Sequence, residues 1–143
     1  MKIPDELSNY FDKKDFSNYP LVGIPQEFKD SRGLIHNLAD GIIGDVAIIS
    51  SKKGAVRANH VHRNDWHLCY VIDGSLEYYW VDHERQKSML AIIAHQMIFT
   101  PARVPHKLVA ITDSKFLSIS RLSRISAKYE EDTEKLELDF FDE

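Results

Sequence analysis

The chain has 143 residues, of which 43% are hydrophobic and 28% are charged, which is typical of one globular domain with its own core. The formal net charge of −4 argues against nucleic acid as a partner, because phosphate binding requires a basic surface. A single cysteine, Cys69, excludes an intramolecular disulfide. The sequence shows neither a secretory signal nor an apolar run of membrane-spanning length, so we expect a cytoplasmic protein with no membrane partner.

Residues 1–25 are predicted to form an N-terminal arm, in which Pro4–Phe16 has the apolar spacing of a short amphipathic helix. Residues 26–126 consist of short stretches rich in valine, isoleucine, tyrosine and phenylalanine, separated by turn-forming residues. We predict strands at Gly33–Leu38, Asp45–Ser51, Val56–His62, Trp66–Asp73, Ser75–Asp82, Ser88–Ile93, Gln96–Thr100, His106–Ala110 and Phe116–Leu122. Many short strands without alternating helices predict an all-β sandwich or barrel.

Two turns and an acidic end complete this organisation. The pair Asp73-Gly74 predicts a tight turn between two strands, and Asp82–Gln86 predicts a second hairpin loop. Residues 130–143 contain eight acidic side chains and one lysine, a net charge of −7, so the rest of the chain carries a net charge of +3. Residues 127–143 are therefore predicted to be an acidic tail, which either forms a last helix or stays loose under its own repulsion.

Three of the seven histidines crowd into the segment Arg57–His67. Because side chains alternate along a strand, His60 and His62 are predicted to share one face. His67 begins the next strand, where a hairpin can bring it beside the first two, and His106 begins a strand much later in the chain. Neutral imidazole is the commonest protein ligand for transition metals, so these histidines predict a metal site inside the barrel.

The segment GAVRANHVHRNDWHLCYVIDG, from Gly54 to Gly74, resembles the first signature of the cupin superfamily. That signature has a leading glycine, a His-x-His pair, a glutamate and a closing glycine. His60 and His62 stand at the histidine positions, whereas His67 stands where the signature has glutamate.

The later segment HQMIFTPARVPHKLVA resembles the second cupin signature through Pro101 and His106. His95 and Arg103 replace its glycines, and Ala110 replaces its final asparagine. Together the two segments extend the resemblance over residues 54–110.

The resemblance implies a double-stranded β-helix, the RmlC-like jelly-roll barrel of the cupins, with one divalent metal held inside it. Carried over by position, the metal ligands are His60, His62, His67 and His106. An all-histidine site leaves the +2 charge of the metal uncompensated, which favours an anionic or enediol-like ligand. Iron, nickel, zinc, manganese and copper suit such a site better than magnesium or calcium. We expect an isomerase, an epimerase or a metal-dependent oxygenase that acts on a small polar or carbohydrate-like molecule.

The same residues also resemble the sugar-nucleotide branch of the cupins, through RANHVH and through FKDSRGLI at Phe28–Ile35. In that branch no metal is needed, because a histidine removes the proton next to a keto group. His60 or His62 would then be the base and Arg57 would hold a phosphate. Candidates for the partner acid are Tyr70, Tyr78 and Tyr79; the last two are predicted to point to opposite faces.

A third alternative is a binding module without catalysis, which would retain a small ligand tightly and not convert it. The resemblance further implies a homodimer, for which Trp80 and Phe16 are candidate contacts. Cys69, two residues after His67, is expected to face the same side as a small buried residue.

Overall fold

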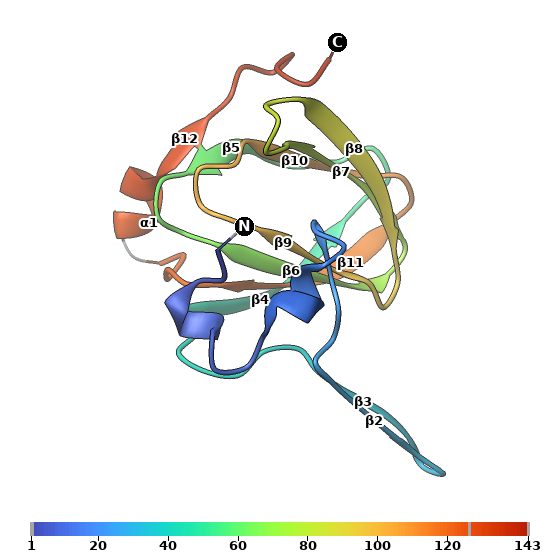
Figure 1. Cartoon of the computed structure of the whole chain (residues 1–143). Helices are drawn as coiled ribbons and strands as arrows, with labels where there is room; N and C mark the ends of the chain where they lie inside the picture. Colours follow the sequence, from blue (N-terminus) through green and yellow to red (C-terminus); the bar gives the residue numbers. More distant parts are fainter. Residues whose placement is uncertain (1, 126, 143) are drawn as a thin grey trace.

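The structure is a computed structural model that describes residues 2–125 and 127–142, and antiparallel strands dominate it (Figure 1). Two five-stranded sheets have the orders β1-β9-β6-β11-β4 and β12-β5-β10-β7-β8, and β2 pairs with β3 in a separate hairpin. The strands are β1 (Leu21–Val22), β2 (Gln26–Asp30), β3 (Gly33–Asn37), β4 (Asp45–Ser51), β5 (Val56–His62), β6 (His67–Asp73), β7 (Ser75–Val81), β8 (Lys87–Ile93), β9 (Met97–Thr100), β10 (His106–Ala110), β11 (Ser114–Ser120) and β12 (Thr133–Lys135). The helical segments are η1 (Asp5–Leu7), η2 (Lys13–Phe16) and α1 (Ala127–Asp132).

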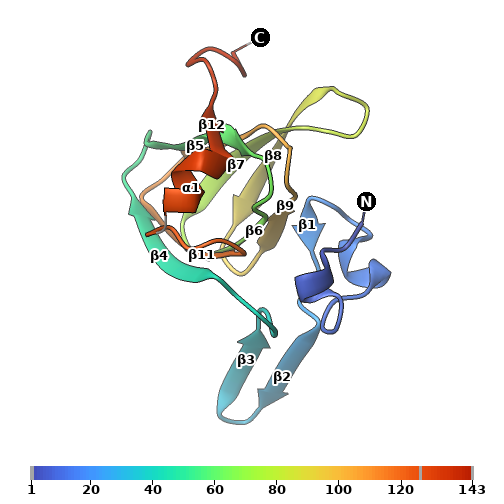
Figure 2. The same ribbon diagram turned by 90° about the vertical axis from the view of Figure 1, so that its left-hand side faces the viewer.

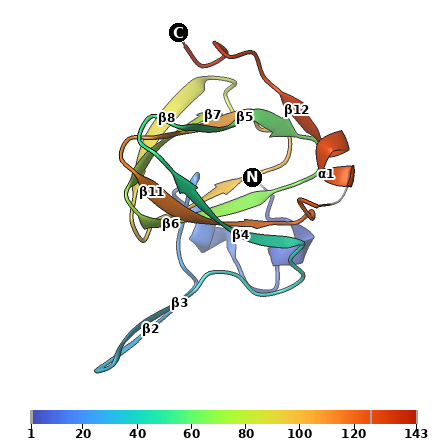
Figure 3. The same ribbon diagram turned by 180° about the vertical axis from the view of Figure 1, so that it is seen from behind.

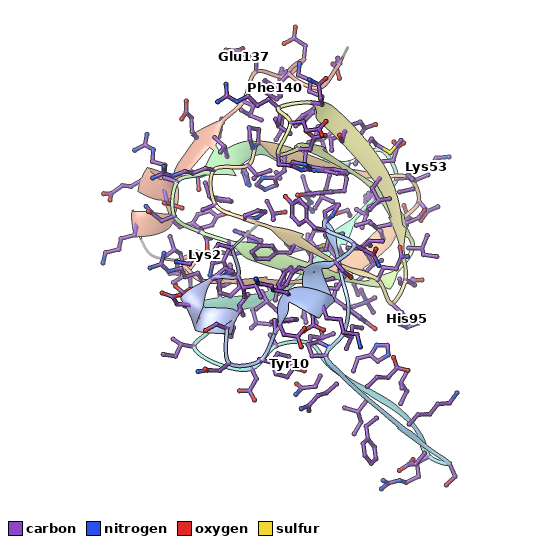
Figure 4. All side chains as sticks on the ribbon, viewed as in Figure 1. Lys2, Tyr10, Lys53, His95, Glu137 and Phe140 are labelled. Carbon is purple, nitrogen blue, oxygen red and sulfur yellow. The ribbon has the colours of Figure 1, made fainter. Side chains whose placement is uncertain are left out.

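The two large sheets face each other, and side chains from both project into the space between them (Figure 4). This arrangement confirms the predicted jelly-roll barrel. Its core consists of side chains that alternate inward along the strands, among them Val71, Leu76, Tyr78, Ile92 and Phe116. Trp80 is also inside the barrel, where it stacks on Tyr78 with 5.3 Å between ring centroids, so it is not available for the expected subunit contact.

The N-terminal arm covers the outer face of the sheet that contains β6, β9 and β11. Leu7, Phe11 and Phe16 are buried there, and Phe16 packs edge-on against Phe99. The arm contains two short 3-10 helices rather than the expected continuous helix. The reason lies at Asp12, whose extended backbone breaks the helix while its carboxylate accepts hydrogen bonds from the next backbone N–H groups.

The predicted acidic tail is not a loose segment along the described residues. It begins with α1 and β12, which lie across one end of the barrel (Figure 2). Beyond β12, Phe141 is buried, and the Nζ atom of Lys107 lies 3.6 Å from a carboxylate oxygen of Asp142. Figure 4 places Phe140 and Glu137 on this side of the molecule. Apolar packing and an ion pair thus outweigh the mutual repulsion of the carboxylates.

The hairpin of β2 and β3 projects away from the barrel (Figures 1 and 3). Every residue of β2 is exposed, and Phe28 faces Ile35 across the hairpin. The predicted turn at Asp73-Gly74 is present between β6 and β7, where Gly74 has a φ of +83° and a Cβ atom would lie 2.4 Å from the carbonyl oxygen of Asp113.

Within residues 2–125 and 127–142, no helix has the length and apolar character needed to cross a membrane.

Candidate metal centre and ligand cavity

The strand β5 carries His60 and His62, and a β-bulge just before His60 changes the direction of its side chains. Ala58 and Asn59 have positive φ angles of 62° and 59°, and the pairing register of β5 with β10 shifts at this point. In a regular strand Arg57 and His60, three residues apart, would face opposite sides. Both line the same cavity here because the extra residue of the bulge changes the direction of the following side chains.

The cavity lies inside the barrel and has a volume of about 330 Å³. Its polar wall gathers side chains from several strands and from the segment that follows β11: Arg57, His60, His67, His106, Ser118 and Arg124. Its apolar wall includes Ile49, Ile98, Leu108 and Phe116. A cavity of this size, with few polar groups on an apolar background, is typical of a site for a small molecule.

Three of the four predicted ligands form one cluster. The ring centroid of His60 lies 4.4 Å from that of His62 and 4.7 Å from that of His106. One nitrogen from each of the three rings lies within 4.8 Å of the others. The Nδ1 atom of His106 donates to the carbonyl oxygen of Val104 at 2.8 Å, which leaves Nε2 of His106 with its lone pair.

Burial keeps these imidazoles neutral. Desolvation, followed by repulsion from the neighbouring rings, lowers the pKa of His60 to about 3 and that of His62 to about 4. The same causes hold the pKa of His106 well below its usual value. A neutral ring retains the lone pair that a metal ligand needs, so all three are ready ligands at neutral pH.

The fourth predicted ligand, His67, lies beside this cluster and has a different partner. Its ring stacks on that of His62 with 4.6 Å between centroids. Its Nε2 atom lies 2.8 Å from Oδ2 of Asp65, and its Nδ1 atom lies 3.5 Å from Oγ of Ser118. Asp65 is completely buried and was missed by the sequence reasoning, because nothing in its spacing marks it as part of the site.

The tyrosines separate as their alternation predicts. Tyr78 lines the cavity, where its hydroxyl lies 2.7 Å from Oγ1 of Thr100 and burial raises its pKa. Tyr79 lies on the other face of β7, under the Nζ atom of Lys107. Tyr70 is also outside the cavity; its hydroxyl lies 3.0 Å from Nδ1 of His95, which Figure 4 shows near the base of the hairpin.

Cys69 lines the cavity, as expected, and is buried there. Burial raises the pKa of its thiol, so it remains a neutral, weakly polar part of the wall.

Two arginines supply positive charge to the cavity. Arg57 donates from Nε to Oγ of Ser51 and from Nη2 to the carbonyl oxygen of Ser50. Arg124 was not predicted from the sequence, because it follows β11 outside any recognisable motif. Its Nη2 atom donates to Oγ of Ser118 at 3.1 Å, and its Nε atom lies 3.3 Å from Oδ2 of Asp45.

Residues 47–120 match the family model described as the cupin domain. No curated protein sequence matches the chain.

Solved structures of low sequence identity share the fold. QdtA, a sugar 3,4-ketoisomerase from Thermoanaerobacterium thermosaccharolyticum solved with TDP, has a TM-score of 0.66 at 16% identity over 87% of this chain and 93% of its own. ChmJ, a 3′-monoepimerase from Streptomyces bikiniensis solved with dTDP-quinovose, has a TM-score of 0.67 at 14% identity over 82% of this chain and 69% of its own. A variant of oxalate decarboxylase from B. subtilis has a TM-score of 0.55 at 24% identity; this chain spans only 23% of its length.

Proposed function

The chain belongs to the cupin domain family, and from that premise we propose that it binds one divalent transition metal through His60, His62 and His106 and acts on a small polar molecule in the cavity beside them. The observation that carries this proposal is the Nε2 atom of His62. It is buried and has no hydrogen-bond partner among the described residues. A buried nitrogen lone pair without a partner is costly unless a ligand satisfies it, and a metal ion among the three rings would do so.

The donor set suits a particular class of metal. Three neutral imidazoles favour iron, nickel, copper, zinc or manganese over magnesium or calcium, which prefer oxygen ligands. When bound, such a metal would act as a Lewis acid toward an oxygen of the substrate.

The surrounding side chains would bind and orient the substrate. Arg57 and Arg124 place positive charge on the cavity wall, which suits a substrate with a carboxylate, enolate or phosphate group. Asp65 holds Nε2 of His67, so Nδ1 of His67 keeps its lone pair; Oγ of Ser118 lies 3.5 Å from it, and a substrate hydroxyl would have to replace that contact.

Elemental analysis of untagged protein tests the proposal. We expect close to one metal ion per chain in the parent protein and very little in a His60→Ala/His106→Ala double variant. The matched control is His83→Ala, because His83 is exposed on a hairpin loop and should not affect the metal content. Absence of metal in the parent, even after incubation with iron(II), nickel, zinc, manganese and copper, would contradict the proposal.

A second candidate is a metal-free nucleotide-sugar ketoisomerase or epimerase that uses His60 or His62 as the base. The folds shared with QdtA and ChmJ support it, as does the presence of Arg57 in the cavity. The low pKa of both histidines argues against it, because such imidazoles are weak bases at neutral pH. Turnover of TDP-4-keto-6-deoxyglucose in the presence of a chelator would favour this candidate over the metal-dependent one.

A third candidate is a binding module without catalysis. The cavity supports it equally well, since a ligand pocket of this kind needs no reactive group. Recovery of a bound small molecule from denatured protein, together with unchanged ligand after incubation, would favour this role.

A further inference from the structure

The strand that carries His60 and His62 is flanked by two segments from later in the chain. On one side β10 pairs His106 with His60. On the other side β12 pairs Thr133 with His62. The tail segment α1–β12 therefore contacts the histidine cluster directly, and Figure 2 shows it across the end of the barrel where β5 lies.

The hydroxyl group of Thr133 contacts both the backbone of Tyr129 and the ring of His62, and its single hydrogen can serve only one of them. Thr133 Oγ1 lies 2.7 Å from the carbonyl oxygen of Tyr129, and a carbonyl can only accept, so the single hydroxyl hydrogen points there. The same Oγ1 atom lies 3.1 Å from Nδ1 of His62. In that second contact Thr133 must accept, and Nδ1 of His62 must donate.

This assignment leaves Nε2 of His62 as the nitrogen with a lone pair, and Nε2 is the buried atom without a partner in the cluster. His106 follows the same pattern, because its Nδ1 atom donates to the carbonyl oxygen of Val104. Metal-ligating histidines characteristically donate the second ring N–H in this way, which fixes both the tautomer and the ring orientation.

A carboxylate reinforces the arrangement. Oδ2 of Asp132 lies 3.8 Å from Nδ1 of His62, where its charge favours the N–H at that position. Asp132 is itself held by backbone N–H groups of Asn64 and Asp65, at 2.8 and 2.9 Å. The tail thus supplies both the acceptor for the His62 N–H and the charge next to it.

We propose that Thr133 is a positioning residue of the metal centre, which fixes His62 as the Nδ1–H tautomer and so directs its Nε2 lone pair to the metal. This inference rests on the proposed metal binding and assigns a role to the C-terminal tail. Thr133 acts through His62 and does not contact the metal or the substrate.

The test compares Thr133→Val, which keeps the shape and removes the hydroxyl, with Thr133→Ser, which keeps the hydroxyl. Long-range ¹H–¹⁵N NMR of the metal-free protein reports the tautomer of each histidine. We expect His62 to be the Nδ1–H tautomer in the parent protein and in Thr133→Ser, and to lose that preference in Thr133→Val. The serine variant controls for misfolding, because a general loss of structure would not leave the tautomer intact in Thr133→Ser and change it only in Thr133→Val.

Competition titration with zinc provides the second measurement. Loss of a hydrogen-bond partner behind a ligating histidine typically costs about 10–100-fold in metal affinity, which is the loss we expect for Thr133→Val. Thr133→Ser should stay close to the parent, as should the control Thr112→Val, whose hydroxyl lies in a surface turn.

The outcomes separate the two proposals. A parent protein that binds no zinc or other divalent metal would overturn the proposed function. An Nε2–H tautomer of His62 in the parent protein would overturn the role of Thr133 whatever the metal result. Equal zinc affinity of the parent and Thr133→Val, with an unchanged tautomer, would overturn the role of Thr133 and leave the metal site standing.

Discussion

Nε2 of His67 lies 2.8 Å from Oδ2 of Asp65, a carboxylate that is completely buried. The other oxygen of Asp65 accepts a hydrogen bond from the backbone N–H of Leu122 at 3.0 Å. One carboxylate therefore connects the cavity histidine with the segment that follows β11, and its removal should affect both folding and ligand binding.

The variant Asp65→Asn replaces one accepting oxygen with an NH₂ group that faces a donor. We expect the free energy of unfolding to fall by about 1–3 kcal/mol, since a buried polar group loses its partner. Urea denaturation measures this change. Asp73→Asn, on an exposed side chain, is the control and should stay within about 0.5 kcal/mol of the parent. An Asp65→Asn variant as stable as this control would show that the contact is not important for folding.

The stability of the metal-free protein should fall as the pH is lowered. Burial holds the pKa of His60 at about 3 and that of His62 at about 4, whereas the ordinary value is 6.5. Between about pH 4 and 6.5 the unfolded chain therefore binds more protons than the folded one, and the free energy of unfolding decreases as the pH falls through this window.

The slope approaches about 1.4 kcal/mol per pH unit for each such histidine. Urea midpoints at a series of pH values measure it. In a His60→Gln/His62→Gln variant the pH dependence should become shallower. An identical profile in both proteins would contradict the assignment of this effect to the cluster.

Metal binding should raise the thermal stability. A ligand that binds only the folded state at 100 times its Kd stabilises by about 2.7 kcal/mol, which corresponds to a rise in Tm on the order of 10 °C for a chain of this size. Thermal unfolding with zinc, before and after addition of a chelator, measures the rise and its reversal. The rise should disappear in His60→Ala/His106→Ala. Its persistence there would place the bound metal elsewhere.

The projecting hairpin predicts self-association. Phe28 and Ile35 are 64% and 63% exposed and lie opposite each other on one face, and a two-stranded hairpin is marginally stable on its own. We expect a homodimer in which a second copy covers these side chains. Light scattering should give about twice the 16.5 kDa mass of one chain.

In a Phe28→Ser/Ile35→Ser variant we expect the monomer mass. The control Ile42→Ser removes a more exposed apolar side chain outside the hairpin and should remain dimeric. A monomeric parent protein would rule out the proposed contact.

The barrel could be predicted from the sequence because its strands follow a local rule. Short β-rich stretches with turn residues between them identified the strands of both sheets except β1 and β12, and the His-x-His pair identified the centre of the site. The bulge at Ala58 and Asn59 was not predicted: asparagine is enriched at positive φ, but alanine is not, and one asparagine inside a β-rich stretch does not indicate two successive positive φ angles. Because simple strand alternation places Arg57 and His60 on opposite faces, the sequence alone could not predict that both line one cavity.

The contributions of Arg124 and of the tail to the site could not be predicted from the sequence either. β12 is three residues long and largely charged, so nothing in its pattern predicts a strand. It forms because the edge of β5 offers it backbone hydrogen bonds, and such a long-range pairing leaves no local trace. The prediction for the N-terminal arm was wrong for the opposite reason. A local pattern was present there, since the apolar residues have helical spacing, but Asp12 interrupts the helix.

The pairing of β12 with β5 also determines when, during translation, the surroundings of His62 can be completed. Thr133 emerges from the ribosome 71 residues after His62. A nascent chain can already contain the other strands of the barrel at the moment when β5 still lacks one neighbour, and His62 then lacks its contact with Thr133. If the cluster binds metal as proposed above, the complete set of contacts around its ligand His62 would therefore exist only after translation has passed the tail.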